Sequence, residues 1–439
     1  MNNSSTVAMI SLGCPKNLVN SEEMLALLQD AGYAFTDDLA KADAVIINTC
    51  AFIESAKTEA IEKILETASY REENPELKII VSGCLAQRYA DDIRAELPEV
   101  DGIMGTGSYG DIVSAVEQVA AGQKFSHFAD ISGPVEELPR VISTPMHYAY
   151  LRIAEGCDNR CAYCVIPSLR GKFRSRTKES ILEEARLLAA SGVKELIIVA
   201  QDITRYGIDL YGKVCLTELL KELCKLDFRW VRLHYLYPEL IDDELIDEIA
   251  SEDKIVKYLD IPIQHINDTI LRRMNRRGTG EEIRALFKKL RERIPGLVLR
   301  TSLITGLPGE GEAEFEELCD FLREAKIERA GVFPYSPEEG TPAALMPDRC
   351  STEEAQRRAE LCMEIQAEIM DGFAETFIGR ELDVLVMGRE PDGTPWGRSE
   401  YDSPDIDSRV IFSGGAAPGD MVRVRIDSVD DGELIGEQI

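Results

Sequence analysis

The chain has 439 residues, a formal net charge of −30 and 44% hydrophobic residues. This length predicts two to four globular domains, and the charge disfavours nucleic-acid binding outside a local basic patch. No signal-peptide pattern opens the sequence and no apolar run approaches the roughly 20 residues of a membrane span, so a cytoplasmic protein is expected. In that reducing compartment, any clustered members of the eleven cysteines predict metal ligands or catalytic thiols.

Residues 1–130 are predicted to form a parallel α/β sheet domain, because short apolar runs alternate with amphipathic helical patterns. The expected strands are Thr6–Cys14, Ala42–Cys50 and Leu77–Cys84, with helices near Ser21–Asp30, Ala56–Ser69 and after Cys84. Ligands of such sheets bind beyond the carboxyl ends of the strands. A single cysteine there is more commonly a small packed residue, but three in equivalent places predict metal ligands: Cys14, Cys50 and Cys84.

Residues 105–110, GTGSYG, fit the glycine pattern of a dinucleotide-binding turn. The strand before them is short, and the unit is the last of its sheet rather than the first. A plain glycine turn into a helix is therefore favoured over dinucleotide binding. Residues 131–146 contain three prolines and little periodicity, and they are predicted to be a linker.

A second series of strand–helix units is expected over residues 147–372. The expected strands are Tyr148–Ile153, Glu195–Ala200, Val231–Tyr237, Tyr258–Ile263, Val298–Ile304 and Ala330–Tyr335. Six such units predict an open or partial (β/α) barrel, in which the chemistry lies at the carboxyl ends of the strands. A long helix is expected over Thr352–Phe377.

Residues 373–439 are predicted to form a small β-barrel, because short β-rich runs alternate with Gly, Pro and Asp. From Asp371 to Ile439 there are sixteen Asp or Glu residues against six Arg and no Lys. A module that grips RNA should be basic, since phosphate contacts dominate that affinity. The acidic barrel instead favours a basic partner, with a solvated acidic face as the alternative.

The segment LRIAEGCDNRCAYCVIPSLRGKFRSR, residues 151–176, holds three cysteines in a C-x3-C-x2-C pattern. Zinc sites usually show four ligands and paired C-x2-C knuckles, and no fourth Cys or His lies close by in the sequence. A four-iron cluster held by three thiolates keeps one iron open for a small-molecule ligand. Cys157, Cys161 and Cys164 therefore predict an iron–sulfur cluster, with zinc as the alternative.

This pattern resembles that of radical S-adenosylmethionine enzymes, and essentially the whole chain is similar to their methylthiotransferase family. The resemblance implies that a [4Fe–4S] cluster on these cysteines binds S-adenosylmethionine, which one electron splits into methionine and a 5′-deoxyadenosyl radical. It also implies a second [4Fe–4S] cluster on Cys14, Cys50 and Cys84, a C-terminal TRAM module, and an approach of the Tyr163 backbone to the adenine. An external electron donor and a sulfur donor are expected as partners.

Two branches of this family modify different substrates. One modifies an adenosine of transfer RNA, and the other adds a methylthio group to the β-carbon of an aspartate in the twelfth protein of the small ribosomal subunit. Four segments resemble the second branch: Ser11–Glu22, Glu155–Arg176, Ile261–Arg276 and Gly331–Ala343. The acidic barrel favours the same branch, so neither a membrane nor a direct nucleic-acid substrate is expected. The transfer-RNA enzyme and a non-catalytic iron–sulfur electron carrier are the alternatives.

Further candidates for cofactor binding lie after two barrel strands. Gln201 and Asp202 follow the second strand and are expected to meet cofactor or substrate. Gly306 and Gly309 resemble the family's glycine-containing cofactor-binding turn after the fifth strand, where they would permit close approach of the backbone. Ordinary turn geometry is the alternative for these two glycines.

The remaining chemistry-bearing residues carry weaker signals. The segment Arg170–Arg176, RGKFRSR, is expected either to hold a carboxylate of cofactor or substrate or to be a solvated run. His234 and His265, near strand ends, are minor candidates for lining the site. The other five cysteines are expected to be small packed or surface residues: Cys215, Cys224, Cys319, Cys350 and Cys362.

Overall fold

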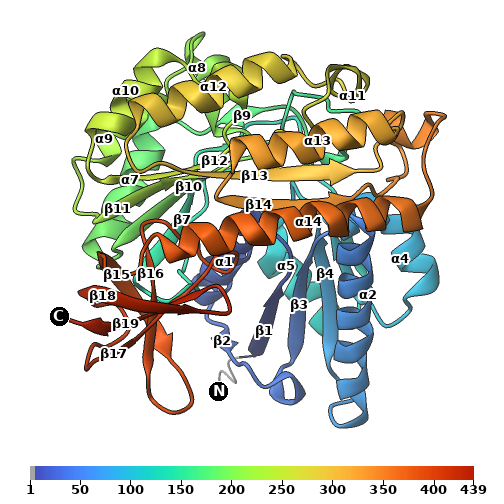
Figure 1. Cartoon of the computed structure of the whole chain (residues 1–439). Coiled ribbons are helices and arrows are strands. Elements are labelled where there is room, and N and C mark those ends of the chain that lie inside the picture. The colour runs from blue at the N-terminus through green and yellow to red at the C-terminus, as the bar shows by residue number, and fades with distance from the viewer. Residues whose placement is uncertain (1–4) are drawn as a thin grey trace.

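The computed structural model describes residues 5–439 and has three parts (Figure 1). An amino-terminal parallel sheet domain lies below helix α14 (Thr352–Glu375) in the figure, a central parallel sheet lies above it, and a closed β-barrel lies at the lower left. This architecture confirms the fold class predicted from the sequence. Within the described residues, no helix is long and apolar enough to cross a membrane.

The amino-terminal sheet has six parallel strands in the order β2-β1-β3-β4-β5-β6. Its strands are β1 (Thr6–Ser11), β2 (Ala34–Phe35), β3 (Ala44–Thr49), β4 (Lys78–Gly83), β5 (Gly102–Met104) and β6 (Phe125–His127). Its helices are α1 (Pro15–Asp30), α2 (Glu54–Ser69), α3 (Cys84–Arg88), α4 (Ala90–Glu96) and α5 (Ile112–Ala120). Val45 and Ile47 of β3 pack with Ile64 of α2, while Ile46 packs with Met24 of α1. Helices on both faces thus explain the continuous apolar run of β3.

The three predicted strands of this domain end before their cysteines. Gly13 and Gly83 have φ of +88° and +89°, which ends the extended backbone one residue before Cys14 and Cys84. Pro15 occupies the first turn of α1, where its missing N–H costs nothing, so this helix begins six residues earlier than Ser21. The cysteines therefore sit at the start of the loops and helices that follow each strand.

The central sheet is parallel and open, with its strands in sequence order from β7 at one edge to β14 at the other. They are β7 (Tyr148–Arg152), β10 (Glu195–Val199), β11 (Trp230–Leu233), β12 (Ile255–Asp260), β13 (Val298–Thr305) and β14 (Arg329–Pro334). The outer helices are α7 (Lys178–Ala190), α8 (Ile208–Tyr211), α9 (Leu216–Leu223), α10 (Asp243–Ser251), α11 (Asp268–Arg273), α12 (Gly280–Arg293) and α13 (Glu312–Ala325). The predicted partial barrel is thereby confirmed.

A small antiparallel pair and a short helix follow β7 and position the three-cysteine loop. They are β8 (Ala154–Glu155), β9 (Arg174–Ser175) and α6 (Ile166–Arg170). Gly156 has φ of +82°, and a Cβ there would lie 2.1 Å from the carbonyl oxygen of Lys172. Only glycine fits this approach, which brings the start of the cysteine loop against the RGKFRSR segment.

The C-terminal strands close into a barrel in the order β15-β16-β17-β19-β18. They are β15 (Glu381–Arg389), β16 (Pro395–Ser399), β17 (Val410–Ser413), β18 (Met421–Asp430) and β19 (Glu433–Gln438). This barrel packs on the central sheet, since Leu385 is fully buried with Trp230 and Tyr258. Glu195 of β10 accepts hydrogen bonds from Arg232 (2.6 Å) and from Arg398 of the barrel (2.5 Å).

Ion pairs also join the amino-terminal domain to the central sheet. Residues 131–146 contain no helix or strand, and Arg140 within them pairs with Glu22 of α1 (3.2 Å) and Glu184 of α7 (2.9 Å). At the opposite side of the interface, Glu338 accepts hydrogen bonds from Lys57 (3.2 Å) and Arg88 (2.6 Å). These ion pairs therefore fix the position of the amino-terminal sheet relative to the central sheet.

Candidate functional site

The first set of thiols lies at the carboxyl edge of the amino-terminal sheet. We call Cys14, Cys50 and Cys84 the amino-terminal thiol set. A Cβ at Gly13, next to Cys14, would lie 3.1 Å from Cys50 Sγ. Burial and the neighbouring Cys14 and Cys84 raise the pKa of Cys50 to about 12. The fold thus brings these three side chains together from strand ends that are far apart in the sequence.

Two buried cations stand beside this set. Burial alone would raise the pKa of the Cys14 thiol, but Lys16 and Arg170, with backbone hydrogen bonds, lower it. Arg170 also lowers the pKa of Cys84, but burial outweighs this effect and leaves that pKa raised. Both cations are almost fully buried. They favour thiolate at a site that burial alone would keep neutral.

The second set of thiols lies at the carboxyl edge of the central sheet, between β8 and α6. We call Cys157, Cys161 and Cys164 the barrel thiol set. The Tyr237 hydroxyl lies 3.2 Å from Cys161 Sγ, and Arg276 Nη1 lies 3.9 Å from the same sulfur. The Arg276 guanidinium stacks 4.2 Å from the centroid of the Tyr237 ring. A buried cation therefore stands beside this set as well.

The donors in both sets suit an iron–sulfur cluster. Thiolates are soft ligands, and they are the residues that hold such clusters in proteins. Each thiolate of a four-iron cluster binds its own iron, so the three sulfurs need not converge on one point. Among residues 5–439, no three His, Cys, Asp or Glu side chains stand close enough to hold a single metal ion. The three-thiol sets, each with a buried cation, fit a negatively charged cluster.

A buried polar network joins the two edges. Arg170 donates to Asn20 Oδ1 (2.8 Å) and to Glu155 Oε2 (3.4 Å), and it also bonds Asn17. Gln201 donates to Glu155 Oε1 (2.5 Å). Arg170, Glu155 and Gln201 belong to the central domain, whereas Asn17 and Asn20 belong to α1. The carboxyl edges of the two sheets therefore face each other.

The lysine of α1 crosses the same boundary. Lys16 Nζ lies 3.5 Å from the centroid of the Tyr235 ring, which follows β11. Burial lowers the pKa of Lys16, but Tyr235, Cys14 and Glu155 outweigh that effect and leave it raised. Lys16 thus remains charged at the boundary between the two domains.

The other predicted cofactor residues surround the barrel thiol set in different ways. Tyr163 is half-buried against Ala162, Met274 and Leu307. Gln201 Oε1 is buried without a hydrogen-bond partner among the described residues. The neighbouring Asp202 accepts a hydrogen bond from Asn159 (2.8 Å) in the cysteine loop. Tyr163 thus lies within this loop, and Gln201 precedes the residue that bonds it.

Gly306 and Gly309 occupy the turn after β13 and both have positive φ, +75° and +89°. A Cβ at Gly306 would lie 2.4 Å from the Cβ of Ala355 on α14, and one at Gly309 would lie 2.8 Å from the Arg273 guanidinium. The absent side chains therefore face the protein itself. Turn geometry and packing alone require glycine at both positions.

Two of the four cations in the RGKFRSR segment are buried and bonded to other residues of the protein. Arg170 and Arg176 are buried. Arg176 donates to Glu137 (2.7 Å) and also bonds Glu184, both carboxylates of this chain. The expectation of a solvated segment is wrong for these two residues. Their partners within the protein could not be identified from the sequence, because no regular spacing relates them.

The two candidate histidines contact other residues of the protein, and side chains of the protein also fill the GTGSYG turn. His234 lies 3.0 Å from Ser403 Oγ of the β-barrel, and His265 lies 3.3 Å from Glu310. Burial, aided by nearby cations, holds the pKa of His234 well below its ordinary value.

A Cβ at Gly105 would lie 2.4 Å from Gln87 Oε1, so side chains of this chain fill the GTGSYG turn. The plain-turn interpretation is favoured.

The five other cysteines lie outside both thiol sets. Four are buried and Cys350 is half-buried, as the sequence predicts for packed residues. Cys319 and Cys362 lie 3.9 Å apart, sulfur to sulfur, between α13 and α14.

Sequence reasoning missed several charged and polar residues at the site. They are Lys16, Asn17, Glu155, Tyr237 and Arg276. Four lie within segments that the resemblance had singled out, and Tyr237 is the last residue of a predicted strand. A polar or charged residue close to a cysteine or at the end of a strand could have indicated most of these positions. The sequence did not show that these side chains would be buried.

Three protein families match successive parts of the chain. The family described as uncharacterized protein family UPF0004 matches residues 6–105, the radical SAM superfamily matches residues 151–322, and the TRAM domain matches residues 378–439. The radical SAM enzyme TsrM from Kitasatospora setae, solved with cobalamin and a [4Fe-4S] cluster, shares the fold. Its TM-score is 0.55 at 15% identity, with coverage of 78% of this chain and 77% of that one.

Full-length relatives are far more similar. A protein from Lachnoclostridium phytofermentans named ribosomal protein uS12 methylthiotransferase RimO is 48% identical over 432 residues, covering 97% of this chain and 98% of the relative. A protein of the same name from Pelotomaculum thermopropionicum is 50% identical over 440 residues, covering 99% of each. With relatives this similar along nearly its whole length, the chain belongs to the RimO family of radical S-adenosylmethionine methylthiotransferases.

Proposed function

We propose that this protein adds a methylthio group to the β-carbon of an aspartate in ribosomal protein uS12. The observation that carries this proposal is the placement of two thiol sets at sheet edges that face each other. Lys16 and Arg170 each reach from one domain to the other at that boundary. An electron carrier needs neither two such sites at one domain boundary nor a large open barrel around one of them.

Each thiol set would hold one [4Fe–4S] cluster, and the barrel thiol set would leave one iron open for S-adenosylmethionine. When bound there, the cofactor supplies a carbon radical able to remove hydrogen from an unactivated C–H bond, and a second S-adenosylmethionine supplies the methyl group. Tyr163, Gln201, Gly306 and Gly309 are the cofactor contacts we propose, the glycines through their backbone. An external electron donor and a sulfur donor are required to complete the reaction.

The chain's own residues orient and shield the site. Ala162, Ile270, Met274 and Leu307 form a buried apolar group behind the cysteine loop, which keeps water from one side of it. Ala162 N donates to the Met274 carbonyl (2.8 Å), so the loop is pinned to the segment after α11. Gln201 presents its unpaired carbonyl oxygen beside Glu155 and can accept a hydrogen bond from a bound amino group.

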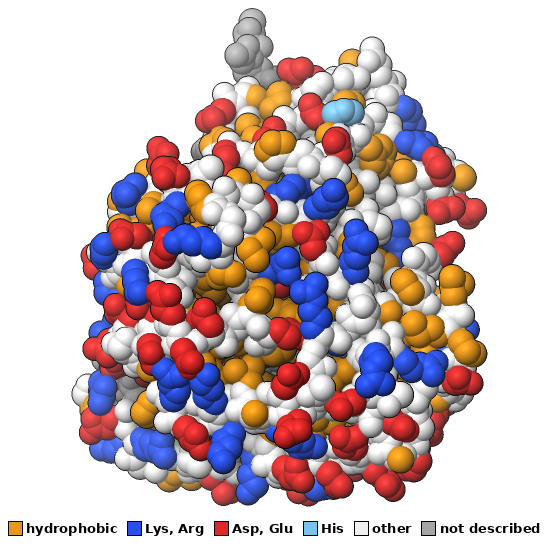
Figure 2. Space-filling model, turned by 90° about the horizontal axis from the view of Figure 1, so that it is seen from above, with side chains coloured by type: hydrophobic (Ala, Val, Ile, Leu, Met, Phe, Trp, Pro, Cys, Tyr) orange, Lys and Arg blue, Asp and Glu red, His pale blue; other side chains and the backbone are white. Residues whose placement is uncertain are grey.

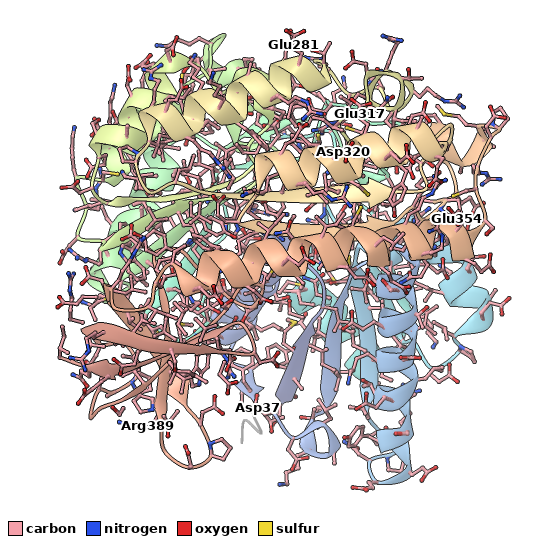
Figure 3. All side chains as sticks on the ribbon, in the orientation of Figure 1. Asp37, Glu281, Glu317, Asp320, Glu354 and Arg389 are labelled. Atoms are coloured by element: carbon pink, nitrogen blue, oxygen red, sulfur yellow. The ribbon has the colours of Figure 1, made fainter. Side chains whose placement is uncertain are left out.

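The C-terminal barrel supplies an acidic surface for a basic ribosomal protein. Asp392, Asp420, Asp430 and Asp431 are exposed and, among the described residues, have no cation within ion-pair distance. Acidic side chains also mark helices α12, α13 and α14, where Figure 3 labels Glu281, Glu317, Asp320 and Glu354. Complementary charge accelerates encounter with a basic partner and weakens it as salt rises.

The protein surface is mixed rather than uniformly acidic near the central hollow. Figure 2 shows hydrophobic side chains gathered in a hollow, with Lys and Arg interspersed among Asp and Glu around it. The net charge of −30 nevertheless opposes a transfer-RNA substrate. A ribosomal protein substrate also places the enzyme in the cytoplasm.

Mass spectrometry of competing substrates tests the proposal. The anaerobically loaded protein is given S-adenosylmethionine, reductant and sulfide with uS12 and unmodified transfer RNA in one reaction. We expect a methylthio group on an aspartate of uS12 and none on the RNA. Modification of adenosine alone would contradict the proposal.

A charge variant tests the docking surface. Changing Asp430 and Asp431 to Asn should raise the KM for uS12 severalfold at low salt without altering cleavage of S-adenosylmethionine. The matched control changes Glu281 to Gln and Asp320 to Asn on the outer helices, away from the barrel (Figure 3). Equal effects of the two double variants would show that only net charge matters.

A further inference from the structure

Arg170 belongs to the barrel but lies beside the thiols of the other domain. It ends α6, six residues after Cys164, and its side chain is buried. It donates to Asn20 (2.8 Å) and bonds Asn17, three residues after Cys14, across the domain boundary; Asn17 in turn donates to the carbonyl of Thr49 (2.8 Å), next to Cys50. A residue of the segment that carries one thiol set is therefore bonded to the helix that follows Cys14 of the other set.

The Glu155 carboxylate next to Arg170 also pairs with a second arginine. Glu155 Oε2 lies 3.1 Å from Arg152 Nη1 and 3.4 Å from Arg170 Nη1. Arg152 in turn pairs with Glu23 (2.5 Å). The neighbouring buried Glu22 is engaged by Arg140 (3.2 Å) and by the backbone N–H of Ser143 (2.7 Å). In the remaining group, the buried cations Lys16, Arg152 and Arg170 outnumber the buried carboxylates Glu23 and Glu155. An uncompensated buried charge is costly, so this surplus requires a negative group nearby.

The amino-terminal thiol set supplies that negative group when it holds a cluster. A [4Fe–4S] core carries two positive charges in its oxidised form, so three thiolates leave it with net negative charge. Lys16 lies two residues after Cys14, and Arg170 bonds Asn17, whose amide group donates to the carbonyl of Thr49 next to Cys50. The surplus cation and the anionic cluster would then balance within one buried region.

We infer that Arg170 is a positioning residue that supplies the counter-charge of the cluster on the amino-terminal thiol set and fixes that cluster against the barrel. The inference rests on the proposed function, because it requires two clusters in one chain. Asn17 and Asn20 hold the guanidinium in place, so its position depends on the docking of α1 on the barrel. Substitution of Arg170 should therefore affect one cluster and spare the other.

The test compares Arg170→Gln, Arg170→Lys and Lys172→Gln in the full-length, anaerobically loaded protein. Lys172 is the matched control, because it carries the same charge on the same segment but is exposed. Iron and sulfide per chain are measured, and the reduction potential of each cluster is followed by electron paramagnetic resonance. The signal that changes on addition of S-adenosylmethionine identifies the barrel cluster.

Loss of a nearby cation disfavours the more negative, reduced cluster. Arg170→Gln should therefore shift the amino-terminal cluster to a more negative potential, or cost the protein that cluster alone, while S-adenosylmethionine cleavage continues. Arg170→Lys should restore most of the loss, and Lys172→Gln should change neither potential. These results would support the inference.

Two results would overturn it. One is an Arg170→Gln protein with both clusters loaded and both potentials matching those of Lys172→Gln. The other is equal loss of both clusters in Arg170→Gln and Arg170→Lys, which would show a general role in folding. Failure of the unsubstituted protein to take up two clusters would instead contradict the proposed function.

Discussion

The contact between the C-terminal barrel and the central sheet depends on one buried carboxylate. Glu195 has no exposed side-chain surface, and it accepts hydrogen bonds from Arg232 and Arg398 at 2.6 and 2.5 Å. Burial would raise the pKa of Glu195, but the two arginines lower it, so the carboxylate is charged at neutral pH. Changing Glu195 to Gln leaves two buried guanidiniums without their counter-charge.

The expected cost is large. Removing one partner of a buried ion pair costs about 3–5 kcal/mol, and each hydrogen bond to a charged group contributes about 1.5–3 kcal/mol. With a urea dependence of about 3 kcal/mol per molar, the unfolding midpoint should fall by at least about 1 M. The exposed pair of Lys221 and Glu244, 3.2 Å apart, provides a control whose loss should leave the unfolding midpoint nearly unchanged.

The chain's two tryptophans report on this contact. Trp230 packs at the interface with Leu385, and Trp396 lies on β16 of the barrel. Urea unfolding of Glu195→Gln and Glu244→Gln is therefore followed by tryptophan fluorescence under anaerobic conditions. Equal midpoints for the two variants would refute the reasoning, because a buried and an exposed carboxylate would then contribute alike.

Further predictions concern the thiols, a glycine turn and the domain boundary. Cys161→Ala should lower bound iron from about eight to about four per chain and abolish formation of 5′-deoxyadenosine. Cys84→Ala should lose an equal amount of iron, from the other cluster, but should still form 5′-deoxyadenosine. Iron assay and chromatography of the nucleoside product distinguish the two variants. Gly306→Ala should destabilise by about 2–5 kcal/mol from positive φ and a 2.4 Å contact, whereas Gly192→Ala, with open space around it, should cost about 1–2 kcal/mol in urea unfolding. Glu338→Gln should lower the melting temperature at pH 7. Burial raises the pKa of Glu338 but hydrogen bonds from a serine and two cations lower it, so its contribution is present above the ordinary carboxyl pKa of about 4.3 and is lost as the pH falls through its lowered value. An equal deficit of the variant at pH 7 and at strongly acidic pH would contradict this assignment.

The two parallel sheets and the C-terminal barrel could be predicted because their signals are local. Apolar runs such as Ala44–Thr49 are buried on both faces, and alternation with amphipathic helices then defines a parallel sheet. The placement of the thiols at strand ends followed from the same rule. Edge strands such as β2, of two residues, were missed because so short a segment carries no periodicity.

The contacts between domains could not be predicted from the sequence. Arg170 and Arg176 lie in a cationic segment that resembles a solvated run, yet both are buried against partners up to about 150 residues away. Likewise, nothing in the sequence around Arg398 identifies Glu195 as its partner. Such pairs depend on how the finished domains pack, which no local pattern encodes.

Transfer of a labelled hydrogen tests the central claim most directly. The loaded enzyme is given S-adenosylmethionine and uS12 in which aspartate carries deuterium at both β-positions, and the mass of the 5′-deoxyadenosine formed is measured. The account predicts one deuterium in that product, because the radical formed at the barrel thiol set removes hydrogen from the β-carbon. Unlabelled 5′-deoxyadenosine, formed while the methylthio group is still added to uS12, would contradict it.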